Sequence, residues 1–104
     1  MGIMESETGK PIDIADPFAR KLMARYLKRR EAEIGELKLA LEATEFEKIR
    51  VTGHKLFGSG ATYGLNEISR LGQGIEKAAE ARDVGRIRRL IGELQRFLKD
   101  LKIR

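Results

Sequence analysis

The sequence predicts an all-α fold: an antiparallel four-helix bundle with up-down topology. Both prolines, Pro11 and Pro17, lie near the start of the chain, so nothing after Pro17 forbids helix. Apolar residues recur at spacings of three and four, and no stretch alternates as a half-buried strand would. Short connections between helices of similar length favour antiparallel neighbours. We therefore expect a bundle over residues 16–104, preceded by residues 1–15 as a flexible segment or a short helix capping one end.

The first helix is expected from Pro17 to about Ala43. Asp16 can cap its N-terminus, and proline suits the first helical position. The stretch from Lys28 to Glu33 is highly polar, so we expect it to pack only in part. The apolar positions of this helix are Leu22, Tyr26, Ile34, Leu37 and Leu41.

The second helix is expected to begin at Thr44, because Thr44-Glu45-Phe46-Glu47 has the form of a capping box. It should end near Tyr63 and Gly64, where glycine can adopt the left-handed conformation that terminates a helix. Its apolar positions are Phe46, Ile49, Leu56 and Ala61.

Two strongly amphipathic helices complete the bundle, and Asp83 is the expected N-cap of the last one. The stripe of the third helix is Leu65, Ile68, Gly72, Ile75 and Ala79, flanked by Leu71 and Ala78. The stripe of the fourth helix is Ile87, Ile91, Leu94, Leu98 and Leu101.

Composition limits the classes of function. The 104 residues suit one domain, and the absence of cysteine excludes disulfides and thiolate chemistry. No apolar run approaches the roughly 20 residues of a spanning helix, and the N-terminus has no signal-peptide core, so we expect a cytoplasmic protein. The net charge is +5, but the basic residues are mixed with carboxylates, which is typical of a solvated face and also suits an acidic protein partner.

His54 is the one place in the sequence where chemistry could reside. It is the single histidine of the chain, and no Walker-type glycine loop accompanies it. Hydrolase chemistry needs a base, a nucleophile and an orienting group, or several metal ligands. We therefore expect neither a conventional enzyme, nor a metal site, nor a tightly bound cofactor.

Glycines surround His54 at positions where a helix has no local reason to accept them. Gly53, Gly58 and Gly60 each cost about 0.8–1 kcal/mol relative to alanine. Gly58 lies four residues after His54, hence on the same face, where a missing side chain leaves the imidazole uncovered. The alternative is that glycines let helices pack closely, which suits Gly60 or Gly72 better than Gly58. The residues sharing the face of His54 are Arg50, Val51, Phe57, Gly58 and Ala61.

The stretch His54-Lys55-Leu56-Phe57-Gly58-Ser59-Gly60, with Gly64 ten residues past the histidine, resembles the signature of histidine phosphotransfer (HPt) domains. The similarity covers about residues 17 to 100 and includes Glu76 after Ile75 in the third helix. It implies that His54 accepts a phosphoryl group from a receiver-domain aspartate and passes it to another receiver. The receiver would supply a magnesium ion, and Lys55 would give electrostatic support.

Phe57 departs from this resemblance, because the family usually has a lysine three residues after the histidine. Lys55 or Arg50 could substitute for that lysine. Phe57 itself could be a core residue or an exposed apolar contact for the receiver.

The sequence also allows two alternative functions. One is a pseudo-HPt protein that regulates a kinase or receiver by binding without being phosphorylated, and Phe57 is its support. The other is a basic nucleic-acid-binding module, which ranks last because no helix carries a clear set of base-reading side chains. We also expect a monomer, possible partnership with a hybrid histidine kinase, and, because the chain begins with Met1, a free-standing protein.

Overall fold

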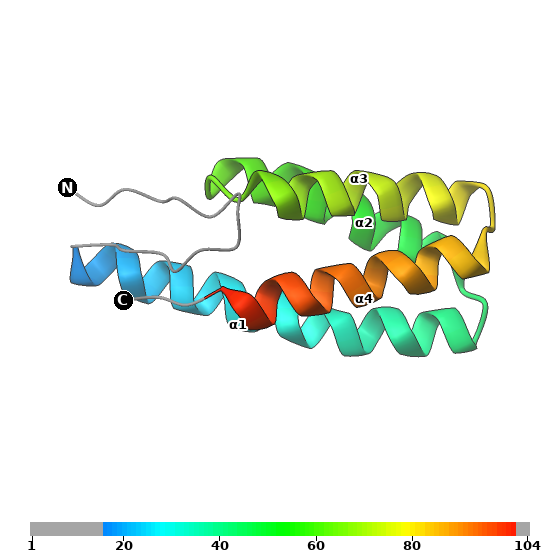
Figure 1. The fold of residues 1–104 in the computed structure, drawn as a ribbon, viewed down its shortest axis with the longest axis horizontal. Helices are drawn as coiled ribbons and strands as arrows, with labels where there is room; N and C mark the ends of the chain where they lie inside the picture. Colours follow the sequence, from blue (N-terminus) through cyan, green and yellow to red (C-terminus); the bar gives the residue numbers. More distant parts are fainter. Residues whose placement is uncertain (1–15, 102–104) are drawn as a thin grey trace.

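The computed structural model describes residues 16–101 and confirms the four-helix bundle. The helices run up and down in sequence order, each beside the next, and α4 returns to lie against α1 (Figure 1). No strand occurs within residues 16–101. The prediction for residues 1–15 lies outside the described residues. The helices are α1 (Pro17–Glu42), α2 (Phe46–Thr62), α3 (Asn66–Glu80) and α4 (Val84–Asp100).

The predicted stripes of α3 and α4 form the core, and every residue named for them is buried. In α1 one prediction was wrong: Leu22 is exposed, and its neighbour Met23 is fully buried instead. Both residues lie within a turn of Tyr26, so the spacing alone left two choices. None of the four described helices is long and apolar enough to cross a membrane.

Two predicted N-caps are confirmed. The Asp16 side chain accepts a hydrogen bond from the Phe18 amide at 3.0 Å, and Asp83 accepts one from the Arg86 amide at 3.1 Å. These side chains satisfy backbone donors that have no partner inside the first helical turn. The helix starts at Pro17 and Val84 are therefore set by local sequence.

The three connections between helices share one geometry. The middle residue of each has positive φ: Thr44 at 53°, Gly64 at 72° and Arg82 at 54°. The following amide then donates to a carbonyl five residues earlier, as in Glu45 N to Ala40 O at 2.8 Å. This is the Schellman arrangement, in which a left-handed residue ends the helix.

The predicted capping box at Thr44 was therefore wrong. Thr44 terminates α1, and α2 begins at Phe46 with no side-chain cap from Glu45. The Thr44 hydroxyl donates instead to the carbonyl of Ala43 at 2.7 Å. An N-cap needs extended backbone, which is incompatible with the left-handed conformation that the turn imposes on this residue.

The polar middle of α1 packs only in part, as expected: Lys28, Arg29, Glu31 and Ala32 are exposed, whereas Arg30 is half-buried and Glu33 is buried. Glu33 is 5% exposed, and Arg30 pairs with it at 2.7 Å. The Arg30 guanidinium also lies 4.5 Å from the centre of the Tyr26 ring and donates to the Ser59 hydroxyl at 3.3 Å. This cluster joins α1 to the C-terminal half of α2.

Candidate functional site

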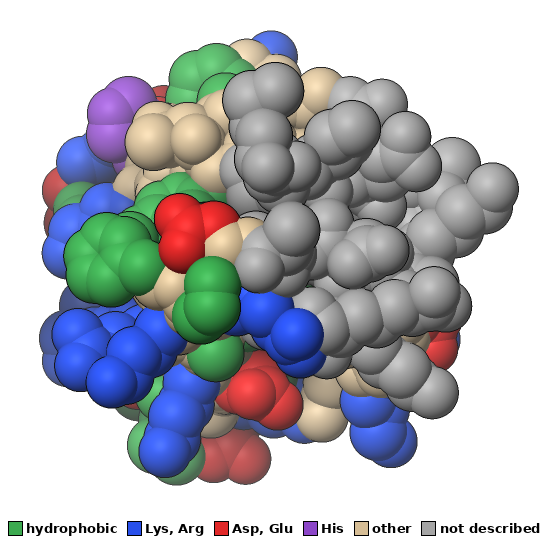
Figure 2. All heavy atoms as spheres, turned by 90° about the vertical axis from the view of Figure 1, so that its left-hand side faces the viewer, with side chains coloured by type: hydrophobic (Ala, Val, Ile, Leu, Met, Phe, Trp, Pro, Cys, Tyr) green, Lys and Arg blue, Asp and Glu red, His purple; other side chains and the backbone are tan. Residues whose placement is uncertain are grey.

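The His54 side chain is 67% exposed and projects from the middle of α2. Figure 2, an end-on view from the side where α1 begins, shows the imidazole in purple at the surface. Its Nδ1 lies 3.1 Å from Oε2 of Glu76 on α3. Its Nε2 has no hydrogen-bond partner among residues 16–101. One ring nitrogen is therefore anchored, and the other faces solvent.

The contact with the Glu76 carboxylate favours one tautomer of the His54 imidazole. A carboxylate accepts hydrogen bonds, so it favours the tautomer with the proton on Nδ1. The lone pair is then on Nε2, the open side of the ring. Glu76 is 18% exposed at its side chain, so water competes little for this contact. Sequence reasoning noted Glu76 only within the family resemblance and missed it as a site residue, because it lies 22 residues away from His54.

Glycines bring α2 and α3 close enough for this contact. A Cβ built on Gly53 would lie 2.7 Å from the Glu76 amide nitrogen and 2.8 Å from the Gly72 carbonyl. A Cβ on Gly72 would lie 2.6 Å from the Phe57 amide nitrogen. These distances are too short for any side chain, so the two backbones touch directly. Gly53 immediately precedes His54, so the close approach occurs beside the imidazole.

Gly58 has a different environment from these packing glycines. Apart from the adjacent residues and backbone of α2 itself, no atom lies within 4 Å of the position that a Cβ would occupy there. The bundle therefore does not require glycine at this position for its packing. The space lies over the turn next to His54 and is open to solvent.

Arg50 lies one turn before His54 and belongs to the same cluster. Its Nε and Nη2 donate to the two carboxylate oxygens of Glu47 at 2.9 and 2.6 Å. Its Nη1 lies 4.0 Å from the Glu76 oxygen that also contacts His54. The hydrogen bonds from Arg50 hold the pKa of the Glu47 carboxyl below its usual range. Glu47 is in turn the main cause of the raised pKa of Arg50, and the charges of Glu76 and Glu80 contribute to it.

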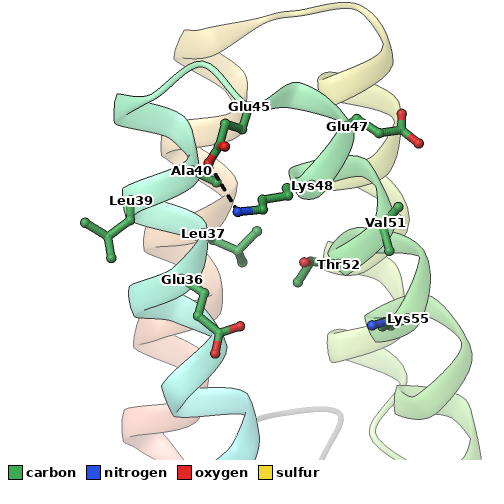
Figure 3. Close-up of a pocket in the computed structure, with 10 residues that line it drawn as sticks. All are labelled: Glu36, Leu37, Leu39, Ala40, Glu45, Glu47, Lys48, Val51, Thr52 and Lys55. Atoms are coloured by element: carbon green, nitrogen blue, oxygen red, sulfur yellow. Dashed lines mark ion pairs between the residues drawn. The ribbon is translucent and has the colours of Figure 1, made fainter.

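The remaining predicted site residues lie on two sides of His54. Phe57 is 39% exposed and outside the core, and its carbonyl accepts a hydrogen bond from Ser69 of α3 at 2.6 Å. Val51 and Lys55 instead border a groove of about 650 Å³ between α1 and α2 (Figure 3). Lys55 thus lines this groove, and within residues 16–101 its side chain makes no hydrogen bond or ion pair with Glu76. Ala61 is exposed two turns after His54.

The Hpt domain family matches residues 21–102, which is most of the chain. This chain belongs to the Hpt domain family. A curated relative of this Hpt domain is Multistep phosphorelay regulator 1 of Schizosaccharomyces pombe, which is 29% identical over 76 residues. The alignment covers 73% of this chain and 26% of the yeast protein, so the chain spans about a quarter of that relative's length. No solved structure matches the chain.

The structure of this Hpt domain brings together only some of the residues predicted for its site. Arg50 and His54 both approach Oε2 of Glu76, a residue that was not predicted for the site. Phe57 and Gly58 lie beside them on the exposed face of α2. Lys55 and Val51 line the neighbouring groove instead. Within residues 16–101 no cluster of three or more potential metal-ligating side chains was found.

Proposed function

We propose that this Hpt domain is a phosphoryl carrier in a multistep phosphorelay, accepting the group on His54 from one receiver aspartate and passing it to another. The observation that carries the proposal is the state of the imidazole: Nδ1 is held by Glu76, and Nε2 is open to solvent. The family and the relative named as a phosphorelay regulator support a phosphotransfer role.

The proposed step is an in-line displacement at phosphorus. The Nε2 lone pair forms the new P–N bond while the P–O bond to the receiver aspartate breaks, and the aspartate carboxylate leaves with that electron pair. Attack places positive charge on the ring, next to the Glu76 carboxylate, which can accept the Nδ1 proton. In the reverse direction Glu76 returns this proton, so that the imidazole leaves phosphorus as a neutral group.

Little other chemistry is required of this domain. Phosphoryl transfer depends mainly on alignment and charge neutralisation. A receiver would supply the magnesium ion, while this chain would supply a rigid helix and an exposed nucleophile. The surface that the receiver would contact consists of Arg50, Phe57, Gly58 and Ala61. At the edge of the groove this surface would be extended by Val51 and Lys55. We expect the domain to act as a monomer in the cytoplasm. Receivers and hybrid kinases would meet it there.

The test is phosphoryl transfer from a panel of phosphorylated receivers of the same organism to the wild-type domain and to His54→Gln. We expect an acid-labile, base-stable label on the wild type alone. A receiver that binds the domain while no receiver transfers a label would contradict the proposal and favour a regulatory pseudo-HPt protein. Label on His54→Gln would place the acceptor elsewhere.

A further inference from the structure

A phosphoryl group on His54 would stand among several negative charges. Glu76 contacts the imidazole, and Glu47 lies about two turns before His54, where it pairs with Arg50. The charge of Glu80 also acts on the Arg50 guanidinium. One turn after His54 stand Phe57 and Gly58, neither of which carries charge. A phosphoryl group adds about two negative charges of its own. The phosphorylated state therefore needs a cation on this face.

Arg50 is the cation whose geometry suits that role. It shares the face of His54 one turn away, and its Nη1 approaches the Glu76 oxygen that anchors the imidazole. Glu47 occupies Nε and Nη2, whereas Nη1 donates no hydrogen bond within residues 16–101. The side chain is 34% exposed, so it can turn toward solvent without leaving a packed site.

We propose that Arg50 binds the phosphoryl group of phosphorylated His54 through the free edge of its guanidinium. The inference rests on the proposed function, because it concerns the same phosphorylated state. Two parallel N–H groups on a planar fork match phosphate oxygens well. Lys55 is less well placed for this part, because it lies about 100° around the helix from His54 and lines the groove between α1 and α2.

The expected consequence is a longer lifetime of phospho-His54. When the P–N bond hydrolyses, water adds to phosphorus and the imidazole leaves with the bonding pair, most readily when its other nitrogen carries a proton. The transition state is loose, so a cation bound to the phosphate oxygens stabilises the intact phosphohistidine more than the transition state. The same positive charge disfavours protonation of the ring. Both effects slow hydrolysis.

Potassium phosphoramidate provides a test that needs no partner protein. Nε2 attacks its phosphorus, the P–N bond of the reagent breaks and ammonia leaves. The full chain is labelled in this way, and the decay of phospho-His54 is followed by ³¹P NMR at neutral pH. We expect Arg50→Ala to shorten the half-life about two- to fivefold, the range for an exposed charge pair, and Arg50→Lys to restore part of it. The difference should shrink in about 1 M salt, where charges are screened within a few ångströms.

Arg70→Ala is the matched control. Arg70 makes the same kind of pair with Glu67, at 2.8 and 2.5 Å and also three residues apart, but on α3 facing Glu93 of α4. We expect its half-life to equal that of the wild type. An unchanged half-life in Arg50→Ala, or an equal shortening in Lys55→Ala, would overturn the proposal.

The outcome also separates this inference from the proposed function. A domain that phosphoramidate labels, and whose label decays faster without Arg50, supports the inference even if no receiver transfers to it; in that case only the relay role fails. A wild-type domain that phosphoramidate does not label would contradict the inference, since it requires an open nucleophile at His54.

Discussion

His54 and Glu76 meet across the α2–α3 interface, with Nδ1 of the imidazole 3.1 Å from Oε2 of the carboxylate. This contact fixes the ring and leaves Nε2 toward solvent. It depends on the close approach of two helix backbones and on one largely shielded carboxylate. Both requirements can be tested separately.

Glu76→Gln should slow phosphoryl transfer. The amide oxygen can still accept the Nδ1 hydrogen bond, but the side chain can no longer take up the proton. We expect a loss of about 10- to 100-fold in the rate of transfer from a phosphorylated receiver, at or below the low end of general acid–base effects because water can assist. Glu67→Gln, a carboxylate on the same helix paired with Arg70, should transfer at the wild-type rate. Wild-type transfer by Glu76→Gln would show that the carboxylate plays no part.

Gly58 can be tested against another exposed helical glycine. Apart from the adjacent residues and backbone of their own helices, neither Gly58 nor Gly35 of α1 has an atom within 4 Å of the position of a built Cβ. Replacing either one with Gln should raise the free energy of unfolding by about 0.5–1 kcal/mol, because glycine disfavours helix. Only Gly58→Gln should block transfer, since its side chain would cover the imidazole. Transfer by Gly58→Gln at the rate of Gly35→Gln would contradict this account.

Gly53→Ala should have the opposite effect on stability. Its methyl group would collide with the backbone of Glu76 and Gly72, so α3 must move away from α2. We expect a loss of about 1–3 kcal/mol in chemical denaturation, the usual cost of overpacking. Separation of the helices should also weaken the His54–Glu76 contact, visible as a changed imidazole resonance in NMR. Gly35→Ala should stabilise the domain, and a stabilised Gly53→Ala would disprove the close approach.

Thr44→Gly should stabilise the domain although it lies between two helices. Thr44 is a β-branched residue held at φ 53°, a conformation that costs an L-residue about 1–2 kcal/mol. Glycine relieves that strain but loses more chain entropy on folding, so we expect a net gain of about 0.5–1 kcal/mol in thermal or urea unfolding. Gly64→Ala, at φ 72° in the next connection, should be destabilised. A less stable Thr44→Gly would mean that the turn is not strained.

Arg30→Met should destabilise the bundle strongly. Glu33 is buried, and Arg30 is its closest partner at 2.7 Å, so the variant leaves a poorly compensated charge. Removing one member of a buried pair typically costs about 3–5 kcal/mol. Arg29→Met is the control, because Arg29 is largely exposed and its contact with Glu33 is longer, at 3.7 Å. Exposed pairs contribute about 0–1 kcal/mol, so similar losses in the two variants would contradict the burial argument.

Much of the fold was determined by the sequence alone, because the relevant signals act between near neighbours in the chain. The apolar stripes of α3 and α4, the caps at Asp16 and Asp83, and the left-handed Gly64 all follow from local geometry. The choice of His54 as the chemical centre also came from local composition, since it is the single histidine and is surrounded by glycines.

Tertiary structure alone decided how residues on different helices meet. The sequence separates Gly58 from Gly72 by its place one turn after His54, but it does not separate Gly58 from Gly53. Only the structure shows that Gly53 lies where α2 and α3 touch, whereas Gly58 faces open space. The left-handed Thr44 followed from the path of the chain between two packed helices, and it overrode a local capping signal. Glu76 reaches His54 only because that helix spacing is short. Distances between helices depend on the whole packed core, so no local pattern could have placed the carboxylate beside the imidazole.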